Sequence, residues 1–278
     1  MKIIGQKELL QGIDDLIRKN HFPRFSIIVG EPGSGKKLIS DYISKNLGCQ
    51  FIPCEIKVEE VRNVLDLSYT IDTPTVYMFA DADKMSSAAK NSILKVTEEP
   101  PQNAYFIMTL LDTQNTLGTL LSRGTVFYMN KYTPNQLEEY CSYKGYNVRD
   151  NELNIIKKVC LTPQDVQNAV SGKIQEFYSL AEKFINLIGT ANLSNELKVG
   201  TFLSYKEDDK KYDPVLFMRT FMFLCNDQFY TSNDKRFFEA LKCTSSFLSL
   251  LSTKGINKVC VIDNWIISLH FIMTGGEL

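Results

Sequence analysis

The chain has 278 residues, of which 44% are hydrophobic, so it is long enough to bury sizeable cores and to form about two domains. Lysine and arginine (31) balance aspartate and glutamate (32), which excludes a global basic field as a basis for autonomous DNA binding. The apolar runs are shorter than the about 18 residues of a membrane span, and no leader-like start is present. We therefore expect neither secretion nor membrane insertion.

The cysteines indicate a reducing compartment. There are seven, an odd number, and none forms a Cys-x-x-Cys pair, which is typical of reduced thiols in a cytoplasmic protein. Only Cys49 and Cys54 lie close together, and a structural zinc site needs two further ligands. We therefore expect no zinc and no other bound metal.

Apolar runs alternate with helical stripes in the N-terminal half of the chain. Helices are predicted at 7–19, 38–47, from 57 onward and at 87–96, and strands at 25–29, 51–52, 75–79, 105–111 and 125–129. Pro53 is expected to end the second of these strands. Strands that alternate with helices predict an α/β layered domain with a mostly parallel sheet, which we place at residues 1–130.

A glycine-rich segment follows the first strand and precedes a helix, as in a phosphate-binding loop. Gly30, Gly33 and Gly35 stand where such a turn needs positive φ or close backbone approach, and Lys36 is placed to reach phosphates. An ordinary glycine-rich surface turn is the alternative, which the flanking strand and helix disfavour. Lys37 replaces the Ser or Thr whose hydroxyl ligates Mg²⁺, so the loop is degenerate.

The strand at 75–79 ends in an acidic segment, where nucleoside triphosphatases hold a magnesium-binding aspartate and a water-polarising acid. Ala80 occupies the first position and Asp81 the second, so the metal-side carboxylate is missing. Asp81 either retains the water-side role or caps the helix that follows, and both interpretations stay open. For Asp83 we expect a helix cap.

The remainder of the chain is predicted to be helical. Thr133-Pro134-Asn135-Gln136 and Thr162-Pro163-Gln164-Asp165 are helix starts with an N-cap and an N1 proline, which indicates a small all-α module at 131–172. Wide apolar stripes predict an all-α domain at 173–278 with the cluster of phenylalanines and Trp265 in its core, and a solvated charged loop at 206–211. The two histidines, His21 and His270, lie far apart and are interpreted as structural.

Three further segments carry a family resemblance: Val76-Tyr77-Met78-Phe79-Ala80-Asp81-Ala82-Asp83-Lys84-Met85, Ala89-Lys90-Asn91-Ser92-Ile93-Leu94-Lys95-Val96-Thr97-Glu98-Glu99-Pro100-Pro101, and Ser122-Arg123-Gly124. With the glycine loop, they resemble the clamp-loader branch of the AAA+ family, most closely its delta-prime type in bacterial DNA polymerase III. The resemblance covers the whole chain. It implies an AAA+ core (1–130), a helical lid (131–172) and a collar (173–278) that joins subunits.

In that family several subunits form an arc, and each ATP lies between one subunit's phosphate loop and an arginine of the next. Ser122 and Arg123 match the motif that carries this arginine, with Gly124 in place of a cysteine. The resemblance implies that Arg123 acts in trans on a neighbour's γ-phosphoryl group, where a cation is needed. A surface arginine that pairs with a carboxylate is the alternative. The implied partners are delta- and gamma/tau-type subunits, a sliding clamp and primer–template DNA.

The departures from the family pattern concern one pocket. Lys37 and Ala80 remove two magnesium ligands, the polar sensor falls on Leu110-Leu111, and no arginine lies near Gln164 to Val166, where a lid sensor is expected. The family's four-cysteine zinc module is also missing. We therefore expect a loader subunit without its own hydrolysis, in which ATP or ADP is held, if at all, without a productive Mg²⁺ site. The alternatives are an active ATPase that uses Asp81 and a silent scaffold or phage-encoded adaptor.

Overall fold

The computed structural model describes residues 2–114, 116–171, 174–190, 192–204, 213–251 and 255–275. The chain divides into two compact units, the first comprising Met1–Tyr132 with Thr162–Gln164 and the second Thr133–Leu161 with Asp165–Leu278. The charged run predicted as a loop at 206–211, the boundary at 172/173 and the side chain of Phe177 lie outside the described residues. A division of the second unit into lid and collar stays a prediction.

The first unit is built on a five-stranded sheet in the order β2-β3-β4-β1-β5, in which every pair of neighbours is parallel. The strands are β1 (Phe25–Val29), β2 (Gln50–Cys54), β3 (Thr75–Phe79), β4 (Ala104–Leu110) and β5 (Thr125–Tyr128). Every residue of β1 and β3 is buried, as expected of parallel strands that helices cover on both faces. The predicted α/β architecture is confirmed.

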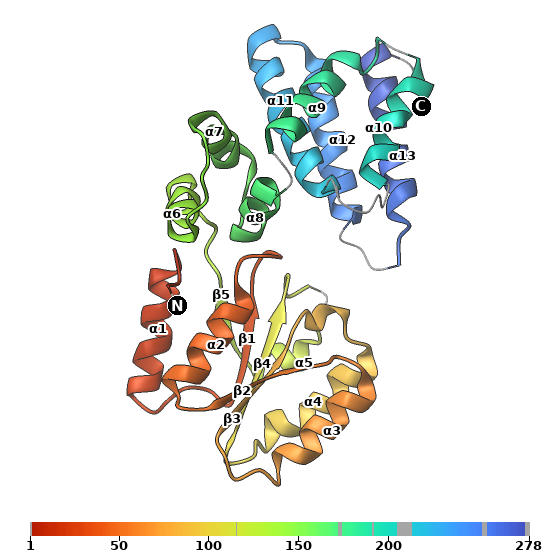
Figure 1. Cartoon of the computed structure of the whole chain (residues 1–278). Coiled ribbons are helices and arrows are strands. Elements are labelled where there is room, and N and C mark those ends of the chain that lie inside the picture. The colour runs from red at the N-terminus through yellow and green to blue at the C-terminus, as the bar shows by residue number, and fades with distance from the viewer. Residues whose placement is uncertain are drawn as a thin grey trace. The chain divides into compact units, whose positions relative to one another are not determined.

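Helices cover both faces of this sheet (Figure 1). On one side lie α1 (Lys7–Arg18) and α2 (Lys36–Asn46), and on the other α3 (Val58–Ser68), α4 (Ser87–Glu98) and α5 (Gly118–Leu121), with a short 3₁₀ helix η1 (Ala82–Lys84) after β3. Alternate residues of β1 serve the two layers: Phe25 and Ile27 pack with the α3–α5 side, whereas Ile28 packs with Ile39 and Ile43 of α2.

Strand β2 does not end at Pro53. It continues to Cys54, so the prediction that proline terminates it was wrong. The reason is the position of β2 at the edge of the sheet, where β3 is its only neighbour among the described strands. An edge strand tolerates a residue without an N–H because one row of its backbone groups has no strand to pair with.

The second unit is helical among its described residues. Its helices are α6 (Pro134–Lys144), α7 (Asp150–Val159), α8 (Pro163–Ser171, whose first two residues belong to the first unit), α9 (Ile174–Leu187), α10 (Leu193–Ser204), α11 (Pro214–Ser232), α12 (Lys235–Leu251) and α13 (Lys258–Thr274). Helix α6 begins with the predicted device: Thr133 and Gln136 form a reciprocal capping box, and Pro134 occupies the first turn. Helix α10 was not predicted from the sequence.

The core of the second unit contains an aromatic cluster. Trp265 has no exposed surface, and its ring lies 5.4–6.2 Å from those of Phe184, Phe217 and Phe221. Its indole Nε1 donates to the buried Thr244 Oγ1 at 3.0 Å. The prediction that Trp265 and this cluster are core is therefore confirmed. Phe238, which the sequence placed in a core stripe, is 44% exposed.

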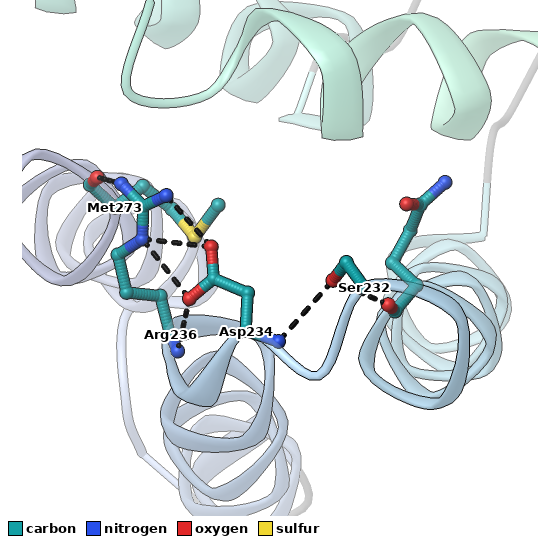
Figure 2. A network of polar contacts seen from close by, with 5 residues as sticks. Ser232, Asp234, Arg236 and Met273 are labelled. Atoms are coloured by element: carbon teal, nitrogen blue, oxygen red, sulfur yellow. Dashed lines mark hydrogen bonds and ion pairs between the residues drawn. The ribbon is translucent and has the colours of Figure 1, made fainter.

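A polar network joins the start of α12 to the end of α13 (Figure 2). The Arg236 guanidinium donates to the Met273 carbonyl oxygen at 2.8 Å and to the Asp234 carboxylate at 2.6 Å. The backbone N–H of Asp234 in turn donates to Ser232 Oγ. Because the last carbonyls of a helix lack intrahelical partners, Arg236 satisfies one such group and fixes the end of α13.

The histidines have no shared site. His270 Nδ1 lies 2.9 Å from the carboxylate of the fully buried Glu196, which also accepts the backbone N–H of Gly189. His21 is exposed on the surface of the first unit. The contact of His270 agrees with the packed structural role expected for it, whereas the exposure of His21 does not agree with packing. Across the described ranges, no helix is long and apolar enough to cross a membrane, and no cluster of three potential metal-binding side chains occurs.

Candidate functional site

The glycine-rich segment lies at the carboxyl end of β1 and leads directly into α2, as a phosphate loop requires. Gly33 (φ 76°) and Gly35 (φ 97°) have the positive φ predicted for them. A Cβ at Gly30 would come within 2.9 Å of the Met129 Cβ, so this glycine allows a close approach between the loop and the segment after β5. The backbone of the loop therefore has the predicted geometry.

Lys36 is folded back on this loop. Its buried ammonium donates to the carbonyl oxygen of Gly30 at 2.5 Å and to that of Glu31 at 3.1 Å. Burial lowers the pKa of Lys36, and the carboxylates of Asp81 and Asp83 act in the opposite direction. In this arrangement the charge that a phosphate would use is engaged by backbone carbonyls.

Two segments from later in the chain cover the loop within the first unit. The backbone N–H of Gln164 approaches the Gly33 carbonyl oxygen at 3.4 Å, and a Cβ at Gly33 would lie only 2.2 Å from the Gln164 Cβ. The Tyr132 hydroxyl donates to the Ser34 carbonyl oxygen at 2.7 Å. Gln164 thus reaches the loop from the region in which the family resemblance places a charged sensor, but its side chain is neutral.

The acidic residues after β3 make structural contacts. Asp81 has a left-handed backbone (φ 50°), its N–H donates to the buried Thr109 Oγ1 of β4 at 3.0 Å, and its carboxylate pairs with Lys84 at 2.7 Å. It does not cap α4, so that alternative was wrong. Whether Asp81 could orient a water molecule stays a prediction.

Asp83 was predicted to cap a helix, and this was wrong as well. Its Oδ1 accepts the backbone N–H of Leu111 at 2.6 Å, at the end of the neighbouring strand β4. Helix α4 is capped by Ser86, which accepts the N–H of Ala89. The physical reason is that the end of β4 presents a backbone donor that needs a partner, and Asp83 supplies it.

The residues at the magnesium positions do not fit the ion. Lys37 is exposed at the start of α2, and an ammonium has no lone pair to donate to a cation. Ala80 follows β3 without any side-chain oxygen. Leu110 and Leu111 stand where a polar sensor is expected at the end of β4, and Leu110 is fully buried. The side chains at these positions therefore disagree with a productive Mg²⁺–ATP complex.

Arg123 follows α5 and makes two bonds within its own subunit. Its Nη2 donates to Glu98 Oε1 at 2.7 Å and its Nη1 to the Thr119 carbonyl oxygen at 3.0 Å. Ser122 Oγ donates to the same carbonyl at 3.1 Å, so one acceptor organises both residues of the motif. The pairing with a carboxylate, given above as the alternative for Arg123, is present. The Arg123 side chain nevertheless keeps 36% of its surface exposed.

Sequence reasoning did not assign a role to Glu98. It is the last residue of α4, where the negative end of the helix dipole disfavours a carboxylate. That unfavourable placement is the sequence signal that could have pointed to a cationic partner.

Arg123 and the phosphate loop lie at opposite ends of the same two strands. Ser26 is paired with Thr125 at one end and Val29 with Tyr128 at the other, so Arg123 precedes β5 whereas the loop follows β1. With a rise of about 3.3 Å per residue, the five residues of β1 separate these ends by roughly 13–16 Å. This is farther than an arginine side chain extends, so Arg123 cannot serve its own subunit's loop.

Comparison with known proteins agrees with this architecture. The family described as "DNA polymerase III, delta subunit" matches residues 53–133, which include the acidic segment and Arg123. DNA polymerase III subunit gamma of Buchnera aphidicola subsp. Schizaphis graminum is 27% identical over 185 residues, which cover 54% of this chain and 51% of that protein. The subunit tau of Escherichia coli is 24% identical over 242 residues, or 75% of this chain and 36% of that protein. The resemblance to the AAA+ clamp-loader family is confirmed.

Solved structures show the same fold. A DNA polymerase III gamma subunit-related protein from Thermotoga maritima superposes with a TM-score of 0.55 at 14% identity, over 95% of this chain and 99% of that chain. The RuvB Holliday junction branch migration motor of the same organism gives a TM-score of 0.54 at 15% identity, over 83% and 78% of the two chains. The chain spans only about half the length of the Buchnera gamma subunit that it matches (51%).

Proposed function

We propose that this chain is a clamp-loader subunit of the delta-prime type, which does not hydrolyse ATP itself and supplies Arg123 to the ATP site of a neighbouring subunit. The observation that carries the proposal is the position of Arg123, exposed and bonded to its own chain at the end of β1 and β5 remote from the phosphate loop. A cation that cannot reach its own loop remains available to another subunit. The similarity to gamma and tau subunits of DNA polymerase III supports the coarser part of the proposal, a role as a clamp-loader subunit.

The chemistry of phosphoryl transfer explains what the arginine contributes. Negative charge is distributed over the γ-phosphoryl oxygens in the transition state, and a guanidinium can donate two parallel hydrogen bonds to them. Such a group lowers the barrier only if it is held in place before the reaction. The bond from Arg123 Nη1 to the Thr119 carbonyl, shared with Ser122, provides this preorganisation.

The loss of own-site hydrolysis rests on Lys37 and Ala80, whose side chains do not fit a magnesium ion. On this proposal any ATP or ADP in the loop is held passively. The partners are delta- and gamma/tau-type subunits, with the sliding clamp and primer–template DNA reached through the complex. The helices at 131–172 would form a lid, and those at 173–278 the collar that joins subunits.

The test uses the complete loader, reconstituted with its gamma- and delta-type subunits, clamp and primed DNA. Arg123→Ala should lower single-turnover ATP hydrolysis at the adjoining site by about 10³-fold or more, the range observed for arginine fingers. Lys36→Ala should leave turnover unchanged. Arg18→Ala is the matched control, because Arg18 is an exposed arginine of the same unit that also pairs with an acid, Asp15.

Two outcomes would overturn the proposal. Hydrolysis by the isolated chain that is abolished by Lys36→Ala would identify an active ATPase with an unusual metal site. A fully active loader that carries Arg123→Ala would instead identify a scaffold or adaptor that has lost both roles.

A further inference from the structure

The bond between Arg123 and Glu98 joins two segments that sequence reasoning treated separately. Glu98 ends α4, and the only charge partner described for it is the Arg123 guanidinium at 2.7 Å. The C-terminus of a helix carries partial negative charge, so a carboxylate there is unfavourable unless a cation lies close. The position of Glu98 therefore makes it an effective competitor for Arg123.

The pair contributes little to holding the fold together. The side chains of Arg123 and Glu98 are 36% and 58% exposed, and ion pairs in such positions stabilise proteins weakly because water screens them. The ion pair can therefore open while the helices next to it, α4 and α5, stay folded. Thr119 holds the guanidinium independently through its carbonyl oxygen, so Arg123 stays oriented when Glu98 is removed.

The consequence for a phosphoryl ligand is electrostatic. A carboxylate and a phosphoryl group present similar oxygens to a guanidinium, and both bind it through charge-assisted hydrogen bonds. While Glu98 occupies Nη2, the pair carries a net charge near zero and offers less attraction to an anion. A γ-phosphoryl group that approaches Arg123 also meets the negative charge of Glu98 at short range. Both the competition and the repulsion weaken the binding of a γ-phosphoryl group by Arg123.

We propose that Glu98 restrains the arginine finger: its carboxylate competes with the neighbour's γ-phosphoryl group for Arg123 and thereby limits hydrolysis at that site. This inference rests on the proposed function. Glu98 acts through Arg123 and does not itself contact the nucleotide. The opposite role, in which Glu98 promotes hydrolysis by ordering the arginine side chain, predicts a change of opposite sign.

The test compares Glu98→Gln with the unmodified chain in the reconstituted loader. Glutamine keeps the size and an acceptor oxygen but removes the charge. Single-turnover hydrolysis at the adjoining site should rise by about 1.4- to fivefold, the range that corresponds to an exposed ion pair. The increase should shrink as salt is added, since salt screens the carboxylate. Glu99→Gln is the matched control, because Glu99 is an adjacent exposed carboxylate and the bonds of Arg123 involve Glu98 and Thr119.

A double substitution separates this inference from the proposed function. If Glu98 acts through the guanidinium, Glu98→Gln combined with Arg123→Ala should be as slow as Arg123→Ala alone. A loader in which Arg123→Ala slows hydrolysis but Glu98→Gln leaves it equal or lower would overturn the restraint and leave the finger intact. Equal increases from Glu98→Gln and Glu99→Gln would overturn it too, since they would indicate a general charge effect. If Arg123→Ala changes nothing, the proposed function fails and the restraint with it.

Discussion

Gly124 stands next to the proposed finger, at the position where the clamp-loader motif has a cysteine. A Cβ at this residue would lie 2.9 Å from Cε1 and 3.0 Å from Cδ1 of Phe25, and 3.0 Å from Cδ1 of Ile27. Phe25 is 4% exposed and Ile27 is fully buried, so neither side chain can relieve the clash by moving into solvent. We therefore predict that Gly124→Ala, and more strongly Gly124→Cys, destabilises the first unit.

The magnitude follows from overpacking. An extra methyl group in a filled core costs about 1–3 kcal/mol, because the neighbouring side chains must leave their preferred rotamers. A loss of about 2 kcal/mol corresponds to a fall of about 5–10 °C in the melting temperature of a domain of this size. The backbone of Gly124 lies outside the left-handed region, so the penalty is one of space alone.

The assay must distinguish the two units. The chain has one tryptophan, Trp265, which lies in the second unit, so its fluorescence reports that unit and serves as an internal reference. Urea unfolding of the first unit can be followed by hydrogen exchange of peptides from β1 and β5. Gly118→Ala is the matched control, since no atom lies within 4 Å of a Cβ at Gly118.

The steric argument can be tested by measuring the cost of Gly124→Ala with and without the ring of Phe25. In a Phe25→Leu background, which removes the ring atoms nearest Gly124, the cost of Gly124→Ala should be smaller. A Gly124→Ala chain that unfolds at the same urea concentration as the parent would refute the steric argument. So would an equal cost in both backgrounds.

Two further predictions concern stability. Thr244→Val should destabilise the second unit by about 1–3 kcal/mol, because the buried Trp265 Nε1–H loses its acceptor, and urea unfolding monitored by tryptophan fluorescence measures this. Thr244→Ser keeps the hydroxyl, so an equally large loss there would contradict the hydrogen-bond explanation. Burial, followed by the hydrogen bond to Asp14, raises the pKa of Tyr42 to about 12, above the value of about 10 in an unfolded chain. The contribution of Tyr42 to the free energy of unfolding is therefore fully present below pH about 10 and is lost as pH rises towards 12. Tyr42→Phe should make the free energy of unfolding depend less on pH over this window.

Elements with a strong local signal were predicted closely from the sequence. Strands β1 and β3 match the predicted ranges residue by residue, because a parallel strand buried on both faces is a continuous apolar run. The start of α6 was equally clear, since Thr133, Pro134 and Gln136 together form a capping box with an N1 proline. In each case the residues that determine the structure are adjacent in the chain.

Contacts between distant residues explain the failures. Asp83 bonds to Leu111, 28 residues away, which a local capping rule does not consider. Helix α10 was missed because Gly200 weakens its helical pattern, yet a Cβ there would lie 2.8 Å from Asp263 Oδ1 of α13. Tight packing of α10 on α13 therefore favours a glycine, and tertiary structure overrides the low helix propensity of this residue.

In the candidate site, too, features set by neighbouring residues could be predicted from the sequence, whereas features set by distant contacts could not. The glycine loop and its departures at Lys37 and Ala80 are visible in the sequence because the motif is local. The pairing of Arg123 with Glu98 spans 25 residues and depends on how α4 and α5 are placed on the sheet. Likewise, the reason for Gly124 becomes visible only when Phe25 is seen to fill the adjacent space.

The separation of Arg123 from the phosphate loop along β1 and β5 gives the subunit a direction. Subunits that interact head to tail use one end to donate and the other to receive, and such contacts form open rows unless the rotation closes a ring. On the proposed function, this chain completes an ATP site for one neighbour and offers no working site to the other. Its place in a row would thus mark where coupled hydrolysis stops, and extra copies would not lengthen the active part of the assembly.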